Sequence, residues 1–279
     1  MAAIIDGKRI STEIKDELKE KVAKLKEQGI TGALAVIQVG TDPASCVYVR
    51  NKKRACEYIG IESLSYELPE ETTEKELLDL IAKLNKDDHV KGILVQLPLP
   101  SHIDENAVIK NITPSKDVDG FHPENVGALF IGQPGYVSCT PAGVIQLLKR
   151  SGISMEGKNC VIMGRSNIVG KPMAALMLRE NATVTVTHSR TKNLREICKQ
   201  ADILIVAIGK KELVDASYVK EGAVVIDVGM HRDENNKLCG DVKYAEVEPI
   251  ASAITPVPGG VGPMTIAMLM NNCVESMER

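Results

Sequence analysis

One segment of the chain places a hydroxyl, a phenol and an amine at helical spacing. In the run PASCVYVRNKKRA, Ser45, Tyr48 and Lys52 stand at positions i, i+3 and i+7, so one helix face would carry all three. An amine works as a general base only when much of it is neutral, so a catalytic lysine needs a pKa near physiological pH. On an ordinary amphipathic helix, Lys52 would instead be solvated and Tyr48 half buried.

The position of this helix favours the chemical interpretation. Residues 33–39 (ALAVIQV) form a short apolar run that predicts a buried strand, and Gly40 ends it. The sequence Thr41-Asp42-Pro43 then predicts a helix start, which places the helix just beyond the carboxyl end of a strand. Ligands bind at such ends in open α/β sheets. The cations at 50, 53 and 54 would lower the pKa of a partly buried lysine on the same helix.

Two further polar segments are candidates for the same site. Gln96 ends a second buried strand, 92–97, and could hydrogen-bond a lysine amine without adding a negative charge that would keep the amine protonated. Alternatively, Gln96 satisfies the loop backbone. In the run KDVDG, Asp117 or Asp119 could accept two bonds from adjacent N–H donors of a ring. The alternative is a local turn at Asp119-Gly120.

A glycine turn later in the chain predicts a phosphate-binding site. The predicted strand 159–163 is followed by Gly164-Arg165-Ser166, and Gly170 opens a helix. Backbone N–H groups and a helix N-terminus in this setting can hold a phosphate. The spacing G-x-S-x-x-x-G differs from the usual dinucleotide fingerprint, so a purely structural turn remains the alternative.

The end of the next predicted strand, 183–187, indicates which dinucleotide would bind. An NAD enzyme normally has an acid there, whereas this chain continues with His188-Ser189-Arg190. Arg165, Ser189 and Arg190 could surround a 2′-phosphate, which a carboxylate would repel. The prediction is NADP rather than NAD, the alternative being that Arg190 is only solvated surface.

Alternating helix and strand patterns predict the α/β class, with two α/β domains around a cleft. The second is a Rossmann-type, doubly wound parallel sheet. The first domain is predicted over 1–120 and the second over 139–258. Residues 113–139, rich in Pro, Gly and Asp, indicate a loop or linker, and the last helix, 263–279, is expected to pack back on the first domain.

Composition excludes several classes of function. The net charge of −3, the absence of Trp and the aromatic fraction of 3% argue against a nucleic-acid partner. No apolar run is long enough for a signal peptide or a membrane span, so no membrane partner is expected. Seven cysteines without a C-x-x-C pair indicate free thiols in a reducing compartment, and no metal-ligand spacing occurs among the five histidines. We therefore expect a cytoplasmic protein without a metal.

Five motifs carry a resemblance to a known family. They are VGTDPASCVYVRNK (39–52), GILVQLPLP (92–100), KDVDGFHP (116–123), GRSNIVGKP (164–172) and TPVPGGVGPMT (255–265). In sequence and order they closely resemble the bifunctional methylenetetrahydrofolate dehydrogenase/methenyltetrahydrofolate cyclohydrolase family, over essentially the whole chain. The resemblance implies that 5,10-methylenetetrahydrofolate gives a hydride to NADP, and that water then opens the 5,10-methenyl product to 10-formyltetrahydrofolate.

The resemblance also implies roles for individual residues. Lys52 would be the acid/base of the hydrolysis, Tyr48 would stack on the folate, Gln96 would tune the lysine, and Asp119 would hold the pterin ring. The predicted substrate contacts are Ser45, Val95, Leu97, Pro258, Gly259, Gly260, Val261, Gly262 and Thr265. The predicted NADP contacts are Thr140, Gly164, Arg165, Ser166, Ser189, Arg190 and Met230. Members of the family are generally homodimers joined through the NADP domain.

Two other functions are compatible with parts of the pattern. A shikimate- or amino-acid-type dehydrogenase also pairs an α/β substrate domain with a Rossmann domain, but the glycine loop 259–262 and the KDVDG motif do not suit it. A catalytically silent nucleotide-binding regulator would bind NADP without turnover, which the combination of Lys52, Gln96 and Asp119 argues against.

Overall fold

The computed structural model describes residues 2–279, apart from the side chains of Pro43 and Ala44. The described residues form two compact units. Unit 1 contains the N-terminal segment up to Ser11 together with Ser138–Thr265, and unit 2 contains Thr12–Val137 and Ile266–Arg279. The N-terminal residues therefore cluster with unit 1. The physical reason is that the strand at Ala3–Ile4 pairs with a strand of the second sheet.

Unit 1 is built on a six-stranded sheet in which every pairing is parallel, as the sequence predicted. The strand order is β1-β11-β8-β7-β5-β6. The strands are β1 (Ala3–Ile4), β5 (Asn159–Met163), β6 (Thr183–Thr187), β7 (Ile203–Val206), β8 (Val224–Asp227) and β11 (Ala253–Ile254). Because β6 stands at one end of this order, it is an edge strand.

Short helices and one hairpin connect these strands. The helices are α6 (Cys139–Arg150), α7 (Gly170–Arg179), α8 (Leu194–Cys198), η2 (Ala216–Tyr218) and α9 (Tyr244–Val247). The hairpin pairs β9 (His231–Arg232) with β10 (Leu238–Cys239) in antiparallel register.

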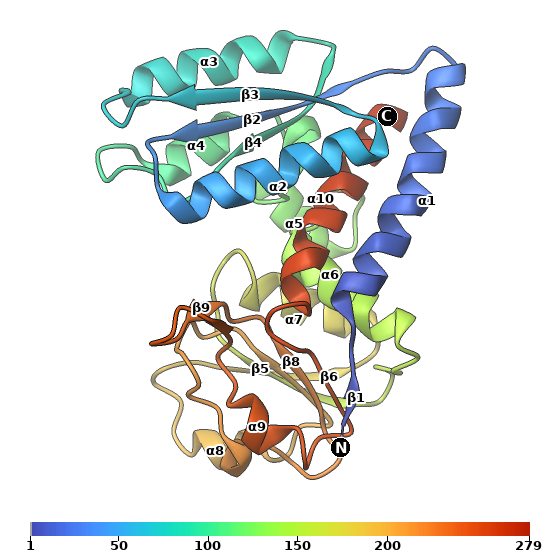
Figure 1. Ribbon diagram of the computed structural model, residues 1–279, viewed down its shortest axis with the longest axis vertical. Helices are drawn as coiled ribbons and strands as arrows, with labels where there is room; N and C mark the ends of the chain where they lie inside the picture. The colour runs from blue at the N-terminus through green and yellow to red at the C-terminus, as the bar shows by residue number, and fades with distance from the viewer. Residues whose placement is uncertain (1) are drawn as a thin grey trace. The chain divides into compact units, whose positions relative to one another are not determined.

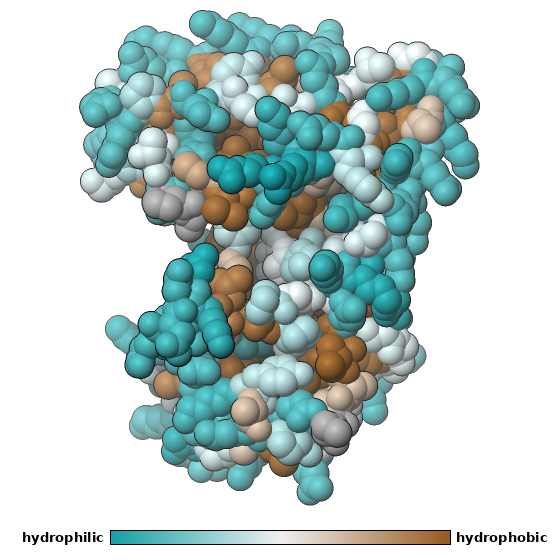
Figure 2. All heavy atoms as spheres, in the orientation of Figure 1, coloured by the Kyte–Doolittle hydropathy of each residue, from teal (hydrophilic) through white to brown (hydrophobic). Residues whose placement is uncertain are grey.

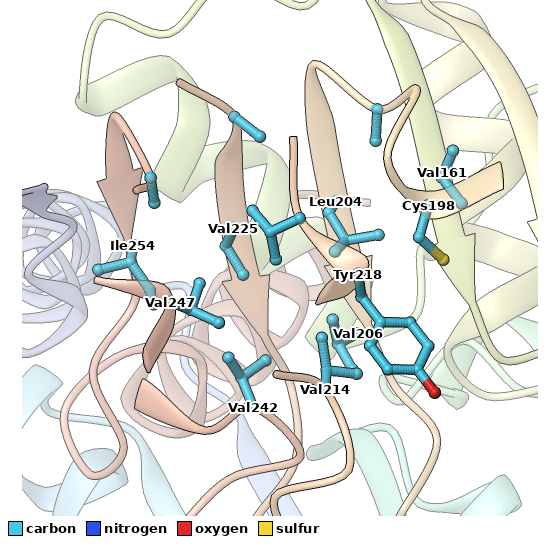
Figure 3. Close-up of a cluster of buried hydrophobic side chains, with 14 of the residues drawn as sticks. Val161, Cys198, Leu204, Val206, Val214, Tyr218, Val225, Val242, Val247 and Ile254 are labelled. Carbon is cyan, nitrogen blue, oxygen red and sulfur yellow. The ribbon is translucent and has the colours of Figure 1, made fainter. Parts of the chain in front are cut away.

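The core of unit 1 lies against the middle strands of this sheet. In Figure 3, Val161, Leu204, Val225 and Ile254 project from four parallel strands toward one buried cluster. The ring of Tyr218 packs into the same cluster. A strand buried in this way reads as a continuous apolar run, which is how the sequence predicted β5 at 159–163.

Unit 2 contains a three-stranded parallel sheet in the order β3-β2-β4. Its elements are α1 (Gly7–Glu27), β2 (Ala33–Val39), α2 (Pro43–Ile59), β3 (Glu62–Leu68), α3 (Glu74–Lys86), β4 (Val90–Val95), α4 (Glu105–Asn111), η1 (Pro114–Lys116), α5 (Pro123–Ile131) and α10 (Val261–Glu278). The division between the units falls inside α1 and inside α10. In Figure 1, α2 and α3 lie on opposite sides of this sheet.

Local capping interactions explain where the helices of unit 2 begin and end. Asp42 caps α2, since its side chain accepts from the backbone N–H of Ser45 at 2.8 Å. Gly60 ends the same helix with a φ of 88°, in the left-handed region that favours glycine. Thr73 and Glu76 form a capping box at the start of α3. These signals are local in sequence, so they locate the helices without tertiary information.

The predicted strands 33–39, 159–163 and 183–187 are observed with the same bounds. The expected loop at 113–139 instead contains η1 and α5. The helix α5 is short, and it is capped by the side chain of His122 at one end and by Gly132 at the other. Elements this short, set among Pro, Gly and Asp residues, carry little periodicity, so the pattern did not reveal them. The last helix clusters with unit 2 from Ile266 onward.

Among the described residues we looked for membrane-spanning helices and for metal-binding groups of side chains. Within residues 2–279, no helix combines the length and apolar character needed to cross a membrane. The same residues contain no group of three or more His, Cys, Asp or Glu side chains placed to hold a metal ion.

Candidate active site

Lys52 is buried and makes a direct hydrogen bond to Gln96. Lys52 is only 8% exposed, and its Nζ donates to Oε1 of Gln96 at 2.9 Å. The Nε2 atom of Gln96 donates to the carbonyl oxygen of Leu97 at 2.7 Å. The sequence left open whether Gln96 contacts the lysine or satisfies the loop backbone. In the structure it does both.

The parallel sheet of unit 2 brings these two residues together. Strands β2 and β4 run in the same direction with Ile37 opposite Val95, so their carboxyl ends meet at one edge. Gln96 follows β4 at this edge, and its backbone N–H donates to the carbonyl of Ile37 at 2.8 Å. Helix α2, which carries Lys52, starts after β2 at the same edge. Ser45 is buried near the beginning of this helix.

Asp117 and Asp119 have different surroundings. The carboxylate of Asp117 is buried and accepts from the backbone N–H groups of Phe121 and His122 and from Nδ2 of Asn125. These bonds hold the turn that the sequence placed at Asp119-Gly120. Asp117 is thus occupied within the loop, which leaves Asp119 as the acidic candidate for a ligand.

The charge of Lys52 acts on Asp119. Loss of water contact raises the pKa of the Asp119 carboxyl to about 6, the cation of Lys52 works in the opposite direction, and the carboxylate of Asp117 adds to the increase. Burial also raises the pKa of the Tyr48 phenol above its usual value. Lys52, Gln96 and Asp119 therefore form one electrostatic group within unit 2.

The neighbouring cations on α2 lie differently from what the sequence suggested. Arg50, Lys53 and Arg54 are exposed, whereas Lys52 is buried, so their charges project into water. Hydrophilic side chains lie over α2 on the face drawn in Figure 2. Water screens such charges, which weakens their effect on a buried amine. Their influence on the pKa of Lys52 stays a prediction.

Lys116 holds the loop that carries the two aspartates, and the sequence did not reveal this. Its Nζ donates to the carbonyl oxygens of Leu84, Asn85 and Asp87, at distances of 2.9, 2.9 and 2.7 Å. These carbonyls lie at the C-terminal end of α3, so the lysine acts as a C-terminal cap from a distant segment. No local signal predicts a cap supplied from a different part of the chain.

The glycine loop before α10 belongs to unit 1 and packs closely against the N-terminal segment. A Cβ added to Gly7 would lie 1.8 Å from the carbonyl oxygen of Gly260, and the backbone N–H of Lys8 donates to the carbonyl of Gly259 at 2.9 Å. The Val257-Pro258 bond is cis. The backbone of Gly259 and Gly260 thus lies directly against the N-terminal segment, while Val261 and Gly262 already belong to α10. A Cβ at Gly262 would meet no atom within 4 Å.

Thr140 and Thr265 are adjacent, although the sequence assigned them to different ligands. Their hydroxyl oxygens are 2.9 Å apart, with Thr140 in the first turn of α6 and Thr265 in the first turns of α10. Thr140, the predicted cofactor contact, and Thr265, the predicted substrate contact, are therefore hydrogen-bonded to each other within unit 1.

The turn after β5 has the close backbone approach that a phosphate site requires. Gly164 has a φ of 117°, and a Cβ there would lie 2.1 Å from the carbonyl oxygen of Ala207. A Cβ at Gly170 would lie 2.2 Å from the carbonyl oxygen of Gly164. Oγ of Ser166 accepts from the N–H groups of Val169 and Gly170, so it caps α7 as well as lining the turn.

The predicted 2′-phosphate contacts meet on two neighbouring strand ends. Strands β5 and β6 are paired with Met163 opposite Thr187, and the N–H of Gly164 donates to the carbonyl of Thr187 at 3.0 Å. Arg165, Ser189 and Arg190 follow these strands directly and are exposed. The residue types, the helix N-terminus and the absence of an acid in the 188–190 segment fit NADP. Met230 is exposed beyond the end of β8.

Comparison with known proteins identifies the family of this chain. Residues 5–119 match the family described as tetrahydrofolate dehydrogenase/cyclohydrolase, catalytic domain, and residues 138–279 match its NAD(P)-binding domain. The chain belongs to the tetrahydrofolate dehydrogenase/cyclohydrolase family. The bifunctional protein FolD of Lachnoclostridium phytofermentans is 75% identical over 98% of this chain and 97% of its own length.

Two solved structures of this family are also similar. The bifunctional FolD enzyme of Campylobacter jejuni has a TM-score of 0.98 and 54% identity, and the match covers 100% of this chain and 99% of that one. The Trypanosoma brucei enzyme, solved with NADP and an inhibitor, has a TM-score of 0.95 and 40% identity, with 100% and 98% coverage. NADP is accordingly the cofactor of this family member.

The sequence interpretation missed two buried carboxylates in the NAD(P)-binding part of this family member. Asp227 ends β8, and burial raises its pKa to about 6, although the N–H groups of Val242, Asp241 and Gly229 work against the increase. Asp241 has no exposed surface. The signal was present, because an acid at the end of the apolar run VVID is unusual in a buried strand.

We expect the Asp119 carboxyl to titrate near pH 6, measured by NMR on carboxyl-labelled protein. The carboxylate charge is then present above about pH 6 and lost as the pH falls through this value. In the Lys52→Met variant the opposing cation is gone, so the pKa of Asp119 should rise further. Lys53→Met removes an exposed charge and should leave it nearly unchanged. A fall in the Asp119 pKa in Lys52→Met would contradict this electrostatic picture.

We expect Arg190→Ala to weaken NADP binding by about 10- to 100-fold, because bonds to a charged group contribute about 1.5–3 kcal/mol. NAD lacks the 2′-phosphate, so its affinity should change little. Lys199→Ala removes an exposed cation elsewhere in unit 1 and serves as the control. Calorimetric titration with both dinucleotides measures the ratio, and equal losses for NAD and NADP would refute the assignment of Arg190.

Proposed function

We propose that this chain carries out two successive reactions on one-carbon derivatives of tetrahydrofolate. The first is oxidation of 5,10-methylenetetrahydrofolate by NADP to the 5,10-methenyl compound, and the second is hydrolysis of that compound to 10-formyltetrahydrofolate. The observation that carries the proposal is the buried amine of Lys52, held by the neutral Gln96 at a strand edge. Membership of the family supports both reactions.

The hydrolysis needs a proton acceptor and then a proton donor. Neutral Lys52 accepts a proton from the water that attacks the bridging carbon. The resulting ammonium then gives a proton to the folate nitrogen as its bond to that carbon breaks. One lysine can act first as the base and then as the acid, because the proton it takes from water is the proton it gives to the folate nitrogen. Gln96 orients the amine through Oε1 without a charge that would hold it protonated.

The folate is assigned to the surroundings of Lys52. Asp119 binds the pterin ring, whose adjacent N–H groups match a carboxylate with two acceptor oxygens. Tyr48 lies one helical turn before Lys52 and supplies a ring for stacking. Support for the remaining substrate contacts, Ser45, Val95, Leu97, Pro258–Gly262 and Thr265, is their place in motifs shared with the family.

The oxidation needs alignment more than acid/base chemistry. NADP accepts the hydride, and the folate nitrogens stabilise the cation that remains. The turn Gly164-Arg165-Ser166 binds the phosphates at the start of α7, while Ser189 and Arg190 bind the 2′-phosphate. Thr140 and Met230 complete the predicted cofactor contacts. The part played by these residues is to hold the dinucleotide in one orientation.

Under this proposal, the predicted segment 1–120 binds the folate and the predicted segment 139–258 binds NADP. The alternative of a shikimate- or amino-acid-type dehydrogenase is not favoured, since the family match spans both parts of the chain. A silent regulator would have no use for a buried lysine with a neutral hydrogen-bond acceptor. A cytoplasmic location is supported by the free state of all seven cysteines.

We also propose a homodimer that is joined through the NADP-binding unit. Strand β6 stands at one end of the six-stranded sheet, and edge strands present a template for pairing with another chain. Val186 on this strand and Leu178 on α7 are large apolar side chains that remain exposed. A second copy of this chain would cover them.

We expect Lys52→Met to reduce hydrolysis of the methenyl compound by about 100- to 10,000-fold, the usual contribution of a positioned acid/base. Oxidation of methylenetetrahydrofolate should fall much less, because hydride loss requires no proton shuttle. A coupled assay follows NADPH and the 10-formyl product separately.

The matched control for this experiment is Lys53→Met, which removes the neighbouring exposed lysine and should leave both activities near wild type. Equal losses of both activities in Lys52→Met, with folate affinity intact, would show that Lys52 is not specific to the hydrolytic step. A wild-type chain without either activity would refute the proposed function as a whole.

We expect Val186→Lys to convert the dimer to a monomer, because a charge on the edge strand opposes pairing. Multi-angle light scattering at micromolar concentration should give half the wild-type mass. Leu213→Lys is the matched control, since Val186 is 38% exposed and Leu213 is 40% exposed in the same unit. A Val186→Lys variant that keeps the dimer mass would exclude this edge as the interface.

A further inference from the structure

Unit 1 contains a fully buried carboxylate, Asp241, on which four N–H donors converge. Oδ2 accepts from the backbone N–H groups of Ile208 and Gly209, at 2.8 and 3.0 Å. Oδ1 accepts from the backbone N–H of Lys210 at 2.8 Å and contacts Nε2 of His231 at 2.7 Å. Asp241 thus joins the loop after β7 to the hairpin strand β9.

A second buried carboxylate connects the same segments. Asp227, at the end of β8, accepts from the N–H of Gly229 at 2.9 Å and from those of Asp241 and Val242 at 3.0 and 2.9 Å. A Cβ added to Gly240 would lie 1.9 Å from Oδ2 of Asp227, so the backbone is packed directly against the acid. Asp227, the last residue of β8, therefore fixes the backbone of the segment that carries Asp241.

These contacts restrain the residue that the sequence assigned to the cofactor. Met230 stands between Gly229, whose N–H is bound by Asp227, and His231, whose ring is bound by Asp241. A Cβ at Gly229 would lie 2.4 Å from Cγ of Asp241. The backbone on both sides of Met230 is thus attached to buried acids, although the side chain of Met230 itself is exposed.

The strand order indicates which half of the dinucleotide these loops would meet. In unit 1, β6 lies on one side of β5, and β7 and β8 lie on the other. A dinucleotide that crosses the carboxyl edge has its pyrophosphate at the turn after β5. The contacts for the 2′-phosphate follow β5 and β6, so the adenosine half extends toward β6. The nicotinamide half must then extend over the loops that follow β7 and β8.

We propose that Asp241 is a positioning residue for the nicotinamide half of NADP. It holds the 208–210 loop through three backbone N–H groups and sets the backbone at Met230 through His231. The inference rests on the proposed function, because it takes NADP as the ligand. The backbone of Asp241 is also fixed directly, because its carbonyl oxygen accepts from the N–H of Val214 at 3.0 Å. Val214 and Val242 form an isolated parallel bridge, and their side chains belong to the buried cluster of Figure 3.

The substitution Asp241→Asn tests the role with the least change in shape. An asparagine keeps one acceptor oxygen but points an amide NH₂ at donors that need an acceptor. We expect its Kd for NADP to rise about 10- to 100-fold, as for loss of bonds to a charged acceptor. Adenosine 2′,5′-bisphosphate contains only the adenosine half, so its Kd should stay within about twofold of wild type.

Two variants at His231 give a second test with a smaller structural change. This test still applies if Asp241→Asn does not fold. His231→Leu removes one donor to Asp241 and leaves the three backbone bonds, so the Kd for NADP should rise about three- to tenfold. His231→Gln restores an N–H donor of similar reach and should return the Kd to within about twofold of wild type. A purely structural role would not show rescue confined to NADP.

Asp202→Asn is the matched control. Asp202 accepts from the backbone N–H of Asn159 and pairs with Lys220, at the amino end of the same sheet. Loss of this carboxylate should lower the stability of unit 1 without changing the carboxyl edge of the sheet. The affinities for NADP and for adenosine 2′,5′-bisphosphate should therefore be unchanged. Calorimetric titration of each variant with NADP and with adenosine 2′,5′-bisphosphate gives the comparison.

Two results would overturn the inference. One is an equal loss of affinity for NADP and for the bisphosphate, which would indicate general damage to unit 1. The other is an unchanged NADP affinity in both Asp241→Asn and His231→Leu. Neither result touches the proposed function, which fails only if the wild-type chain does not bind NADP or does not oxidise methylenetetrahydrofolate.

Discussion

The chemistry assigned to this chain depends on one buried hydrogen bond, between Nζ of Lys52 and Oε1 of Gln96. An ammonium loses stability when it is removed from water, and a nearby carboxylate would offset that loss by holding the amine charged. The neutral amide of Gln96 orients the amine without adding such a charge to that of Asp119, whose pKa responds to Lys52. The bond forms only because β2 and β4 run in parallel and end at the same edge, where α2 also begins.

The second site uses the same geometry with different residues. In unit 1, the carboxyl ends of parallel strands carry a glycine turn, a helix N-terminus and exposed arginines. Gly164 and Gly170 allow backbone to approach backbone at distances that any side chain would block. In both units the proposed site thus lies where the ends of parallel strands converge, which is where open α/β sheets bind ligands.

Buried acids in this protein act mainly on its loops. Asp117, Asp227 and Asp241 each accept from several backbone N–H groups, so they replace the water that those groups would otherwise bind. Asp119 lies within the electric field of Lys52 instead. This difference separates two aspartates that stand only one residue apart in the KDVDG motif, and it leaves the loop acids to fix backbone positions around the ligand sites.

Sequence alone determined the α/β class, the parallel sheets, the main buried strands and the helix starts at Asp42 and Thr73, because apolar periodicity and capping are local. It also determined the candidate residues, since their motifs are long and specific. The tertiary structure decided that Lys52 meets Gln96, that Thr140 meets Thr265, and that Asp117 rather than Asp119 holds the turn. It also revealed the pairing of Asp241 with His231 and the cap that Lys116 places on α3. These contacts join segments that are separate in the chain, and no local pattern specifies which distant donor an acceptor will meet.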